Sequence, residues 1–134
     1  MMRKLVIEAT EFTPEIIFDL NKRLLTFKGV SRPEDVLSFY QPAIDWLKEL
    51  EALIQSQTNT KYIIPKLNIE FRLTYFNSAS SKMLLRILEI IKIIQDKGIE
   101  IKIDWYYDGN DEAMYEDGVD LSEAVEIEFE YHPI

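Results

Sequence analysis

Hydrophobic and polar residues alternate along three segments in the second half of the chain, at residues 67–75, 99–105 and 125–131. In each segment, aliphatic or aromatic residues occupy every second position, and charged or polar residues fill the positions between them. This period of two is typical of strands with one buried face and one wet face. Strands of a parallel sheet that is covered on both faces are apolar throughout. The alternation therefore predicts a sheet with helices on one face only.

Three shorter apolar runs in the first part of the chain, at residues 5–7, 16–18 and 23–28, predict further strands. The second and third runs are separated by Asp19-Leu20-Asn21-Lys22. Aspartate and asparagine favour tight turns because their side chains bond to the local backbone. These two runs therefore predict a β-hairpin, whose second strand ends at Gly29.

A first helix is predicted by apolar residues that recur at helical spacing over residues 36–54. The preceding segment Ser31-Arg32-Pro33-Glu34 matches a capping box, in which a serine begins the helix and a glutamate follows three residues later. Pro42 is expected to kink this helix or to divide it into two, because proline has no N–H to donate. The polar residues 55–60 predict a loop.

Two further helices are predicted. The first covers residues 78–97 and ends before Gly98, at the position that glycine favours after a helix. A weaker helical pattern over residues 111–124 is expected to break or end near Gly118. Taken in order, the elements predict an α/β fold, a two-layer sandwich in which a mixed β-sheet has helices on one face and right-handed crossovers. The length of 134 residues suits a single domain over residues 1–134.

The composition is that of a folded globular protein, with 47% hydrophobic and 12% aromatic residues. The absence of cysteine excludes disulfides, thiolate metal sites and cysteine nucleophiles. A net charge of −9 disfavours nucleic acid and anionic membrane surfaces as partners. The sequence has no nucleotide-binding glycine motif, and no apolar run of the length of a signal peptide or a membrane span. We therefore expect a cytoplasmic protein without a cofactor.

Candidate catalytic and metal-binding residues are few. His132 is the single histidine, and its place near the C-terminus predicts a solvated tail rather than a general base. The acidic segment Asp108–Asp120 superficially resembles a calcium loop, but Ala113 stands at the position of the required glycine and Val119 at that of the bidentate glutamate. We expect a solvated acidic loop without a metal, and we keep a small metal-dependent enzyme that uses this loop as a minor alternative.

The segment Asn77-Ser78-Ala79-Ser80-Ser81-Lys82 lies between a predicted strand and a predicted helix. Its hydroxyl residues have two possible roles. They can serve only as a helix cap, or one of them can carry a phosphate that meets the free N–H groups and the positive dipole end of the helix. A phosphate adds about −1.5 to −2 charges at neutral pH. Lys82 and Arg72 are close enough in the sequence to neutralise part of that charge.

Aromatic residues mark the end of the strand predicted at residues 99–105. By the alternation, Trp105 belongs to the core, Tyr106 to the wet face and Tyr107 to the rim beside the helices. Because exposed aromatic residues favour interfaces, this strand end is a candidate contact surface. The alternate glutamates of residues 126–130 are expected to form a solvated face of the last strand.

Several short motifs, in the same order along the chain, resemble the SiaC-type bacterial regulatory phosphoproteins. The longest, Tyr75-Phe76-Asn77-Ser78-Ala79-Ser80-Ser81-Lys82, is similar to the signature of that family at the point where a strand leads into a helix. The other matching pieces are Phe12-Thr13-Pro14, Gly29 with Pro33-Glu34, Ile44-Asp45-Trp46 and Trp105-Tyr106-Tyr107-Asp108. The resemblance extends from about Thr13 to Asp108.

The resemblance implies a fold similar to the STAS-type anti-sigma-factor antagonists, and a switch protein rather than an enzyme. In this family, a kinase phosphorylates a hydroxyl just after the asparagine of the motif, and a metal-dependent phosphatase removes the phosphate. The unphosphorylated form binds and activates a diguanylate cyclase in the best-known systems, which connects the family to cyclic di-GMP and biofilm signalling. The implied phosphoacceptor is Ser78. The family commonly has threonine there and a hydroxyl residue at Ala79, so Ser80 and Ser81 stay alternative acceptors.

Parallel strands place their C-terminal ends together, which indicates where a partner would bind. The expected partner-binding residues are Asn77, Ser78, Lys82, Trp105, Tyr107 and Asp108. A structural or adaptor subunit whose serines only cap a helix is the main alternative to a phosphorylation-switched binding protein.

Overall fold

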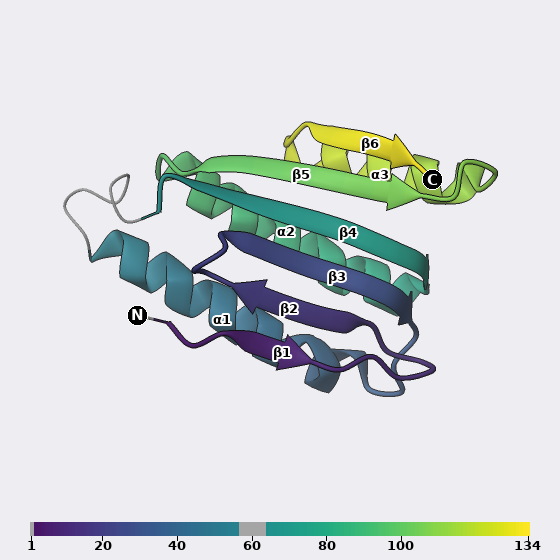
Figure 1. Ribbon diagram of the computed structural model, residues 1–134, viewed down its shortest axis with the longest axis horizontal. Helices are drawn as coiled ribbons and strands as arrows, with labels where there is room; N and C mark the ends of the chain where they lie inside the picture. Colours follow the sequence, from purple (N-terminus) through teal and green to yellow (C-terminus); the bar gives the residue numbers. More distant parts are fainter. Residues whose placement is uncertain (1, 57–63) are drawn as a thin grey trace.

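The computed structural model describes residues 2–56 and 64–134 of the chain, and within these ranges it contains six strands and three helices. The strands are β1 (Leu5–Ile7), β2 (Glu15–Asp19), β3 (Leu24–Ser31), β4 (Lys66–Phe76), β5 (Glu100–Tyr107) and β6 (Phe129–Pro133). The helices are α1 (Val36–Gln55), α2 (Ser78–Asp96) and α3 (Glu112–Val125). The strands form one sheet in the order β1-β2-β3-β4-β5-β6 (Figure 1). The first three strands pair antiparallel, and β3 to β6 run parallel.

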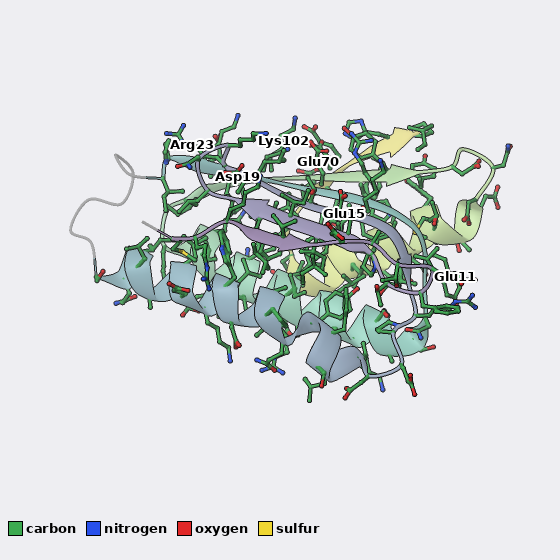
Figure 2. All side chains as sticks on the ribbon, turned by 60° about the horizontal axis from the view of Figure 1, so that its bottom comes forward. Glu11, Glu15, Asp19, Arg23, Glu70 and Lys102 are labelled. Carbon is green, nitrogen blue, oxygen red and sulfur yellow. The ribbon has the colours of Figure 1, made fainter. Side chains whose placement is uncertain are left out.

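The described helices cover the same face of the sheet (Figure 1). Strand residues that point toward the helices are buried, as Leu67 and Ile69 of β4 illustrate. The opposite face carries polar side chains, and Figure 2 shows Glu70 and Lys102 projecting from it away from the helices. We call this uncovered side the open face. The predicted two-layer sandwich with helices on one face of a mixed sheet is confirmed.

Aromatic rings from the four parallel strands form a row through the core. Phe71 of β4 stacks on Phe27 of β3 with the ring centroids 4.7 Å apart, and its centroid lies 5.3 Å from that of Trp105 in β5. Trp105 stacks on Phe129 of β6 at 5.9 Å. Such pairs stabilise a core beyond the area they bury. The prediction that Trp105 belongs to the core is confirmed.

Helix α1 begins at Val36, where the helical spacing predicts it, but another residue caps it and Pro42 does not divide it. Ser31 is the last residue of β3 and is fully buried, so the predicted capping box at Ser31 is wrong. Asp35 caps the helix instead, because its Oδ1 accepts a hydrogen bond from the N–H of Ser38 at 3.2 Å. Pro42 lies inside the continuous helix. Its missing N–H would have donated to the carbonyl of Ser38, an exposed residue, and water can satisfy that oxygen.

The end of the chain also differs from the prediction. Helix α3 continues through Gly118, because this glycine packs against Trp105 and a Cβ at position 118 would lie 2.6 Å from the indole Nε1. The helix extends to Val125, and Glu126 ends it in a left-handed conformation with a φ of 57°. The last strand therefore begins at Phe129 and not at Val125.

The other elements lie where the hydrophobic pattern predicts them. The hairpin of β2 and β3 is present, although β3 continues through Gly29 to Ser31. Gly98 follows α2 with a φ of 103°, as predicted. The predicted loop at residues 55–60 falls partly on residues 57–63, which lie outside the described residues. In the part of the chain that the structure describes, every helix falls short of the length or the apolar character needed to cross a bilayer.

Candidate functional site

The serine segment lies at the end of the sheet where the parallel strands finish. Strand β4 leads through Asn77 into α2, and the connection from β1 to β2 lies at the same end (Figure 1). The backbone N–H of Asn77 donates to the carbonyl of Ser31 at 3.0 Å, so β3 and β4 stay paired as far as the start of the helix. Strand β5 runs parallel to β4 and ends at the same edge of the sheet.

Asn77 is the cap of α2. Its Oδ1 accepts a hydrogen bond from the N–H of Ser80 at 2.9 Å, and its carbonyl accepts one from the N–H of Ser81 at 2.9 Å. The N–H groups of Ser78 and Ala79, the first two residues of the helix, have no partner within the helix. They are therefore the donors that an anion at this helix end would meet. Because Asn77 caps the helix, the prediction that the serines of this segment serve as its cap is wrong.

The three serines of this segment differ sharply in burial. Ser78 is exposed, Ser81 is half-buried, and Ser80 has no exposed surface. The hydroxyl of Ser80 donates to the carbonyl of Ser31 at 3.0 Å and accepts from the Ser31 hydroxyl at 2.8 Å. An enzyme cannot reach the Ser80 hydroxyl in this conformation, whereas Ser78 is open to solvent.

Tyr40 of α1 completes a buried cluster of hydroxyl groups. Its hydroxyl oxygen lies 2.6 Å from Oγ of Ser31, which in turn contacts Ser80. The cluster joins α1, β3 and α2 through Tyr40, Ser31 and Ser80. Burial raises the pKa of Tyr40 to about 12, although its hydrogen bonds to Ser31 and Ser80 act in the opposite direction.

We expect Tyr40→Phe to lower the free energy of unfolding by about 1–2 kcal/mol at neutral pH, because Ser31 loses a buried partner. The difference from the unchanged protein should shrink between pH 10 and pH 12. There, unfolded chains release the tyrosine proton at the ordinary pKa of 10.0, while the folded chain holds it to about 12. The unchanged protein then loses up to about 1.4 kcal/mol per pH unit through this group. Urea unfolding across this pH range measures the effect, and a constant difference would contradict it.

A β-bulge turns Tyr75 toward the solvent. The register of β3 with β4 shifts after Gly29, so that Gly29 pairs with Leu73 whereas Val30 pairs with Tyr75. Thr74 is the extra residue, and a bulge of this kind re-aims the side chains that follow it. Tyr75 is left 49% exposed. The strand alternation places Tyr75 on the buried face, so that prediction is wrong at this residue.

Phe12 adds a second exposed ring at this end of the molecule. The ring is 47% exposed and is presented by a turn in which the N–H groups of Phe12 and Thr13 donate to Oγ1 of Thr10 at 3.2 and 3.0 Å. The N–H of Arg32 donates to the carbonyl of Phe12 at 2.8 Å, which holds the turn beside the end of β3. We call the exposed rings of Phe12 and Tyr75 the aromatic rim. Sequence reasoning did not predict that either ring is exposed, because the bulge and the turn that expose them have no periodic signal.

The structure separates the expected partner-binding residues into exposed and buried ones. Lys82 and Asp108 are exposed, and Tyr107 is half-buried with its ring centroid 5.3 Å from that of Tyr115. Trp105 is only 1% exposed, so its prediction as a direct contact is wrong. Tyr107 and Asp108 line an open hollow of about 640 Å³ between the ends of β4 and β5 and the start of α3.

Arg72 is directed away from the serine segment. Its guanidinium lies 3.6 Å from the ring centroid of Tyr106, and its Nε donates to Glu70 at 3.1 Å, on the open face. The ring of His132 stacks on the same tyrosine with the centroids 4.6 Å apart. Because Arg72 makes these contacts on the open face, the expectation that it neutralises a phosphate has no support in the structure. The prediction of a solvated tail at His132 is wrong, because this residue belongs to β6.

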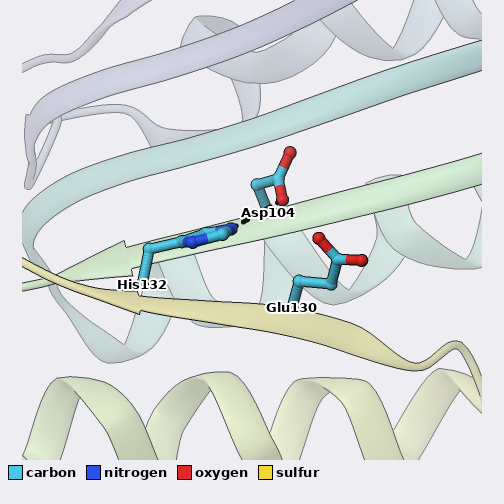
Figure 3. Close-up of side chains that lie close together, drawn as sticks. All are labelled: Asp104, Glu130 and His132. Carbon is cyan, nitrogen blue, oxygen red and sulfur yellow. Dashed lines mark hydrogen bonds and ion pairs between the residues drawn. The ribbon is translucent and has the colours of Figure 1, made fainter.

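Asp104, Glu130 and His132 lie together on the open face (Figure 3), with potential ligand atoms within 4.8 Å of one another. One imidazole and two carboxylates form a donor set that suits several divalent metals. However, Nε2 of His132 lies 2.7 Å from Oδ1 of Asp104. Nζ of Lys102 lies 3.5 Å from Glu130 and 3.9 Å from Asp104. The carboxylates are thus already compensated by groups of the protein. Sequence reasoning missed this cluster because only the pairing of β5 with β6 brings it together.

The acidic segment Asp108–Asp120 is mostly helical and not a loop. Oδ1 of Asp108 accepts from the N–H of Asn110 at 2.8 Å, and Oδ1 of Asp111 caps α3 by accepting from the N–H of Met114 at 3.0 Å. From Glu112 onward the chain is α3, so the predicted solvated loop is wrong there. The residues of this segment, all of them described, form no group of three potential metal ligands.

Comparison with known proteins identifies one family. Residues 7–134 match the sequence profile of a family that is described as "SiaC family regulatory phosphoprotein". An uncharacterized protein of Pseudomonas aeruginosa strain UCBPP-PA14 is 29% identical over 115 residues, which are 86% of this chain and 84% of that protein.

Two solved structures with the same fold come from the same organism. The crystal structure of apo-SiaC from Pseudomonas aeruginosa is 26% identical, with a TM-score of 0.81 over 98% of this chain and 99% of that one. A chain in the crystal structure of the diguanylate cyclase SiaD in complex with its activator SiaC, also from Pseudomonas aeruginosa, is 25% identical. Its TM-score is 0.82 over 97% of this chain and 99% of that one.

Proposed function

The chain belongs to the SiaC family of regulatory phosphoproteins and is not itself an enzyme, and from this premise we propose that it is a binding protein switched by phosphorylation of Ser78. The observation that carries the proposal is the position of this hydroxyl. Ser78 is the exposed serine directly after the Asn77 cap, whereas Ser80 is fully buried and Ser81 is half-buried.

A phosphate on Ser78 would be accommodated without rearrangement of the fold. It would meet the unpartnered N–H groups of Ser78 and Ala79 and the positive end of the helix dipole. Lys82, four residues further along the same face of α2, can add a positive charge. The effect of the phosphate therefore falls on the surface that a partner meets and not on the core.

The partner is a diguanylate cyclase or a protein of that kind. SiaC of Pseudomonas aeruginosa is described as the activator of the cyclase SiaD in their complex. By analogy, the unphosphorylated form of this chain binds and activates such a cyclase. The docking surface comprises Asn77, Ser78, Lys82, Tyr107 and Asp108 together with the aromatic rim.

Phosphorylation blocks this docking because it places a charge of about −1.5 to −2 within the contact surface. Like-charge or unpaired charge in an interface costs several kcal/mol. A kinase adds the phosphate, a metal-dependent phosphatase removes it, and residues 1–134 act as one cytoplasmic regulatory domain. Ser81, which is half-buried, stays an alternative acceptor.

We expect Ser78→Asp to weaken binding of the cognate cyclase at least about tenfold, the equivalent of 1.4 kcal/mol. Ser78→Ala should change binding less than about threefold, since it removes neither the helix cap nor a buried contact. Ser56→Asp, which adds the same charge at the far end of α1, is the matched control and should bind normally. Isothermal titration with the diguanylate cyclases of the organism that makes this protein measures all three variants.

Mass spectrometry of the protein purified from its own cells tests the modification directly. A single phosphate on the peptide that contains Ser78 is the expected result. Equal binding by Ser78→Asp and Ser78→Ala, or native protein that never carries a phosphate in this segment, would refute the switch.

A further inference from the structure

We propose that Arg32 receives the phosphate on Ser78 and that, in doing so, it leaves the ring of Phe12. This inference rests on the proposed function and adds the residue that binds the phosphate. In the structure, the guanidinium of Arg32 lies over Phe12, with its carbon 4.8 Å from the ring centroid. Phe12 belongs to the aromatic rim, so the contact connects the switch to the docking surface.

The pairing of β3 with β4 places Arg32 next to the modified residue. Ser31 pairs with Phe76, and the N–H of Asn77 donates to the carbonyl of Ser31 at 3.0 Å. Arg32 and Ser78 each follow directly on this hydrogen-bonded pair. Neighbouring strands lie about 4.8 Å apart, a distance that an extended arginine side chain exceeds. An arginine side chain is therefore long enough to span the separation between the end of β3 and the start of α2.

The present contact of Arg32 is weak enough to be exchanged. Arg32 is exposed, and no carboxylate lies within ion-pair distance of it among residues 2–56 and 64–134. An exposed cation over a phenylalanine ring is a modest interaction. A guanidinium that binds a phosphate makes two parallel charge-assisted hydrogen bonds, which are stronger and fixed in direction. A dianion on Ser78 should therefore compete successfully for this arginine.

Two other cations are less suited to this role. Arg72 is already bound to Glu70 and Tyr106 on the open face. Lys82 lies one turn further along α2 and is exposed, so it can contribute as a point charge. Its ammonium lacks the planar fork with which arginine matches phosphate oxygens. Lys82 is thus the competing candidate that the experiment must separate from Arg32.

Release of Arg32 would change the docking surface in a second way. The backbone of the Phe12 turn is held by its own hydrogen bonds to Thr10, so the turn keeps its conformation when the guanidinium leaves. The phosphate then adds negative charge at Ser78 and also removes a positive charge from the exposed face of Phe12. A partner that docks on this ring would meet both changes at once.

The experiment uses full-length protein with phosphoserine installed genetically at position 78, which needs neither the kinase nor the cyclase. A pH titration followed by ³¹P NMR gives the second pKa of the phosphate, which is about 6 for an exposed phosphoserine. We expect a value lower by roughly half a unit or more in the unchanged background, because a neighbouring cation favours the dianion. Arg32→Gln should remove a clear part of this lowering, and the rest should stay because the N–H groups at the start of α2 also favour the dianion. Lys82→Gln should remove less of it, and Arg86→Gln, further along the exposed side of α2, should leave it unchanged.

A second measurement needs no substitution at Arg32. In the unchanged background, phosphorylation should shift the ring resonances of Phe12, since the guanidinium no longer lies over the ring. An equal phosphate pKa with and without Arg32, a larger effect of Lys82→Gln, or unshifted Phe12 resonances would each overturn the inference. Loss of cyclase binding is a separate readout. A phosphorylated protein that binds the cyclase normally refutes the proposed function, whatever Arg32 does.

Discussion

Trp105→Ala is expected to lower the free energy of unfolding by about 3–5 kcal/mol, as large-to-small changes of buried aromatic residues do. The indole is 1% exposed, lies in the row of rings between Phe71 and Phe129, and donates its Nε1–H to the carbonyl of Met114 at 3.0 Å. Its removal leaves a cavity where β5 meets α3. Small domains are stable by only about 5–15 kcal/mol, so much of the stability would be lost. Urea unfolding followed by circular dichroism measures the change.

Trp105→Phe is the matched variant that separates packing from the hydrogen bond. It keeps an aromatic ring in the row and removes the indole donor, and we expect a loss of about 1–2 kcal/mol. The carbonyl of Met114 also accepts the intrahelical bond from the N–H four residues later, so it does not become an unpaired buried acceptor. Equal losses for the alanine and phenylalanine variants would show that the row of rings does not carry the stability assigned to it.

Gly118→Val is expected to lower the free energy of unfolding by about 2–3 kcal/mol through overpacking. A Cβ at this position would lie 2.6–2.7 Å from three atoms of the Trp105 indole, which is itself held by neighbouring rings and by Met114. Glycine normally weakens a helix interior by about 1 kcal/mol relative to alanine. At Gly118 the gain in helix propensity is smaller than the cost of the collision between the new side chain and the Trp105 indole.

A surface control and a double mutant test whether the collision with Trp105 causes the loss. Ala124→Val places the same side chain on the exposed side of α3 and should cost only the difference in helix propensity, about 0.6 kcal/mol. In a Trp105→Ala background, Gly118→Val should be tolerated because the cavity accepts the added atoms. The double-mutant cycle should then give a coupling of about 1 kcal/mol or more. Additive losses would mean that the glycine is not required by the tryptophan.

The architecture follows from the alternation of apolar residues, and its errors have local causes. The one-sided sheet, the early hairpin and the long α2 helix are predicted because each depends on a repeating pattern over many residues. Single residues that break a pattern are harder to interpret. The sequence predicts that Gly118 breaks the helix, but α3 continues through it and packs against Trp105 there. The sequence predicts that Ser31 caps a helix, but it is a buried strand residue that is hydrogen-bonded to Tyr40.

The end of the molecule that carries the candidate site is only partly predictable from the sequence. Its segment Asn77–Lys82 is recognised because a strand end, a helix start and several hydroxyl residues coincide there. The aromatic rim is missed, because Tyr75 is exposed by a bulge and Phe12 by a turn. The role proposed for Arg32 has no signal in the sequence, for a different reason. This residue comes forty-six residues before Ser78 in the sequence, and only the parallel pairing of β3 with β4 brings the two together.

The burial of Ser80 beneath its exposed neighbour has a consequence for any kinase that visits this segment. In an unfolded chain the hydroxyls of the three serines would be nearly equivalent targets. In the folded chain only Ser78 is exposed among these three serines. The fold of this protein therefore determines which serine is accessible, and the kinase itself needs little selectivity among them. Under the proposed switch, the kinase must act on the folded chain, because a phosphate added to Ser80 before folding would prevent the buried hydroxyl cluster from forming.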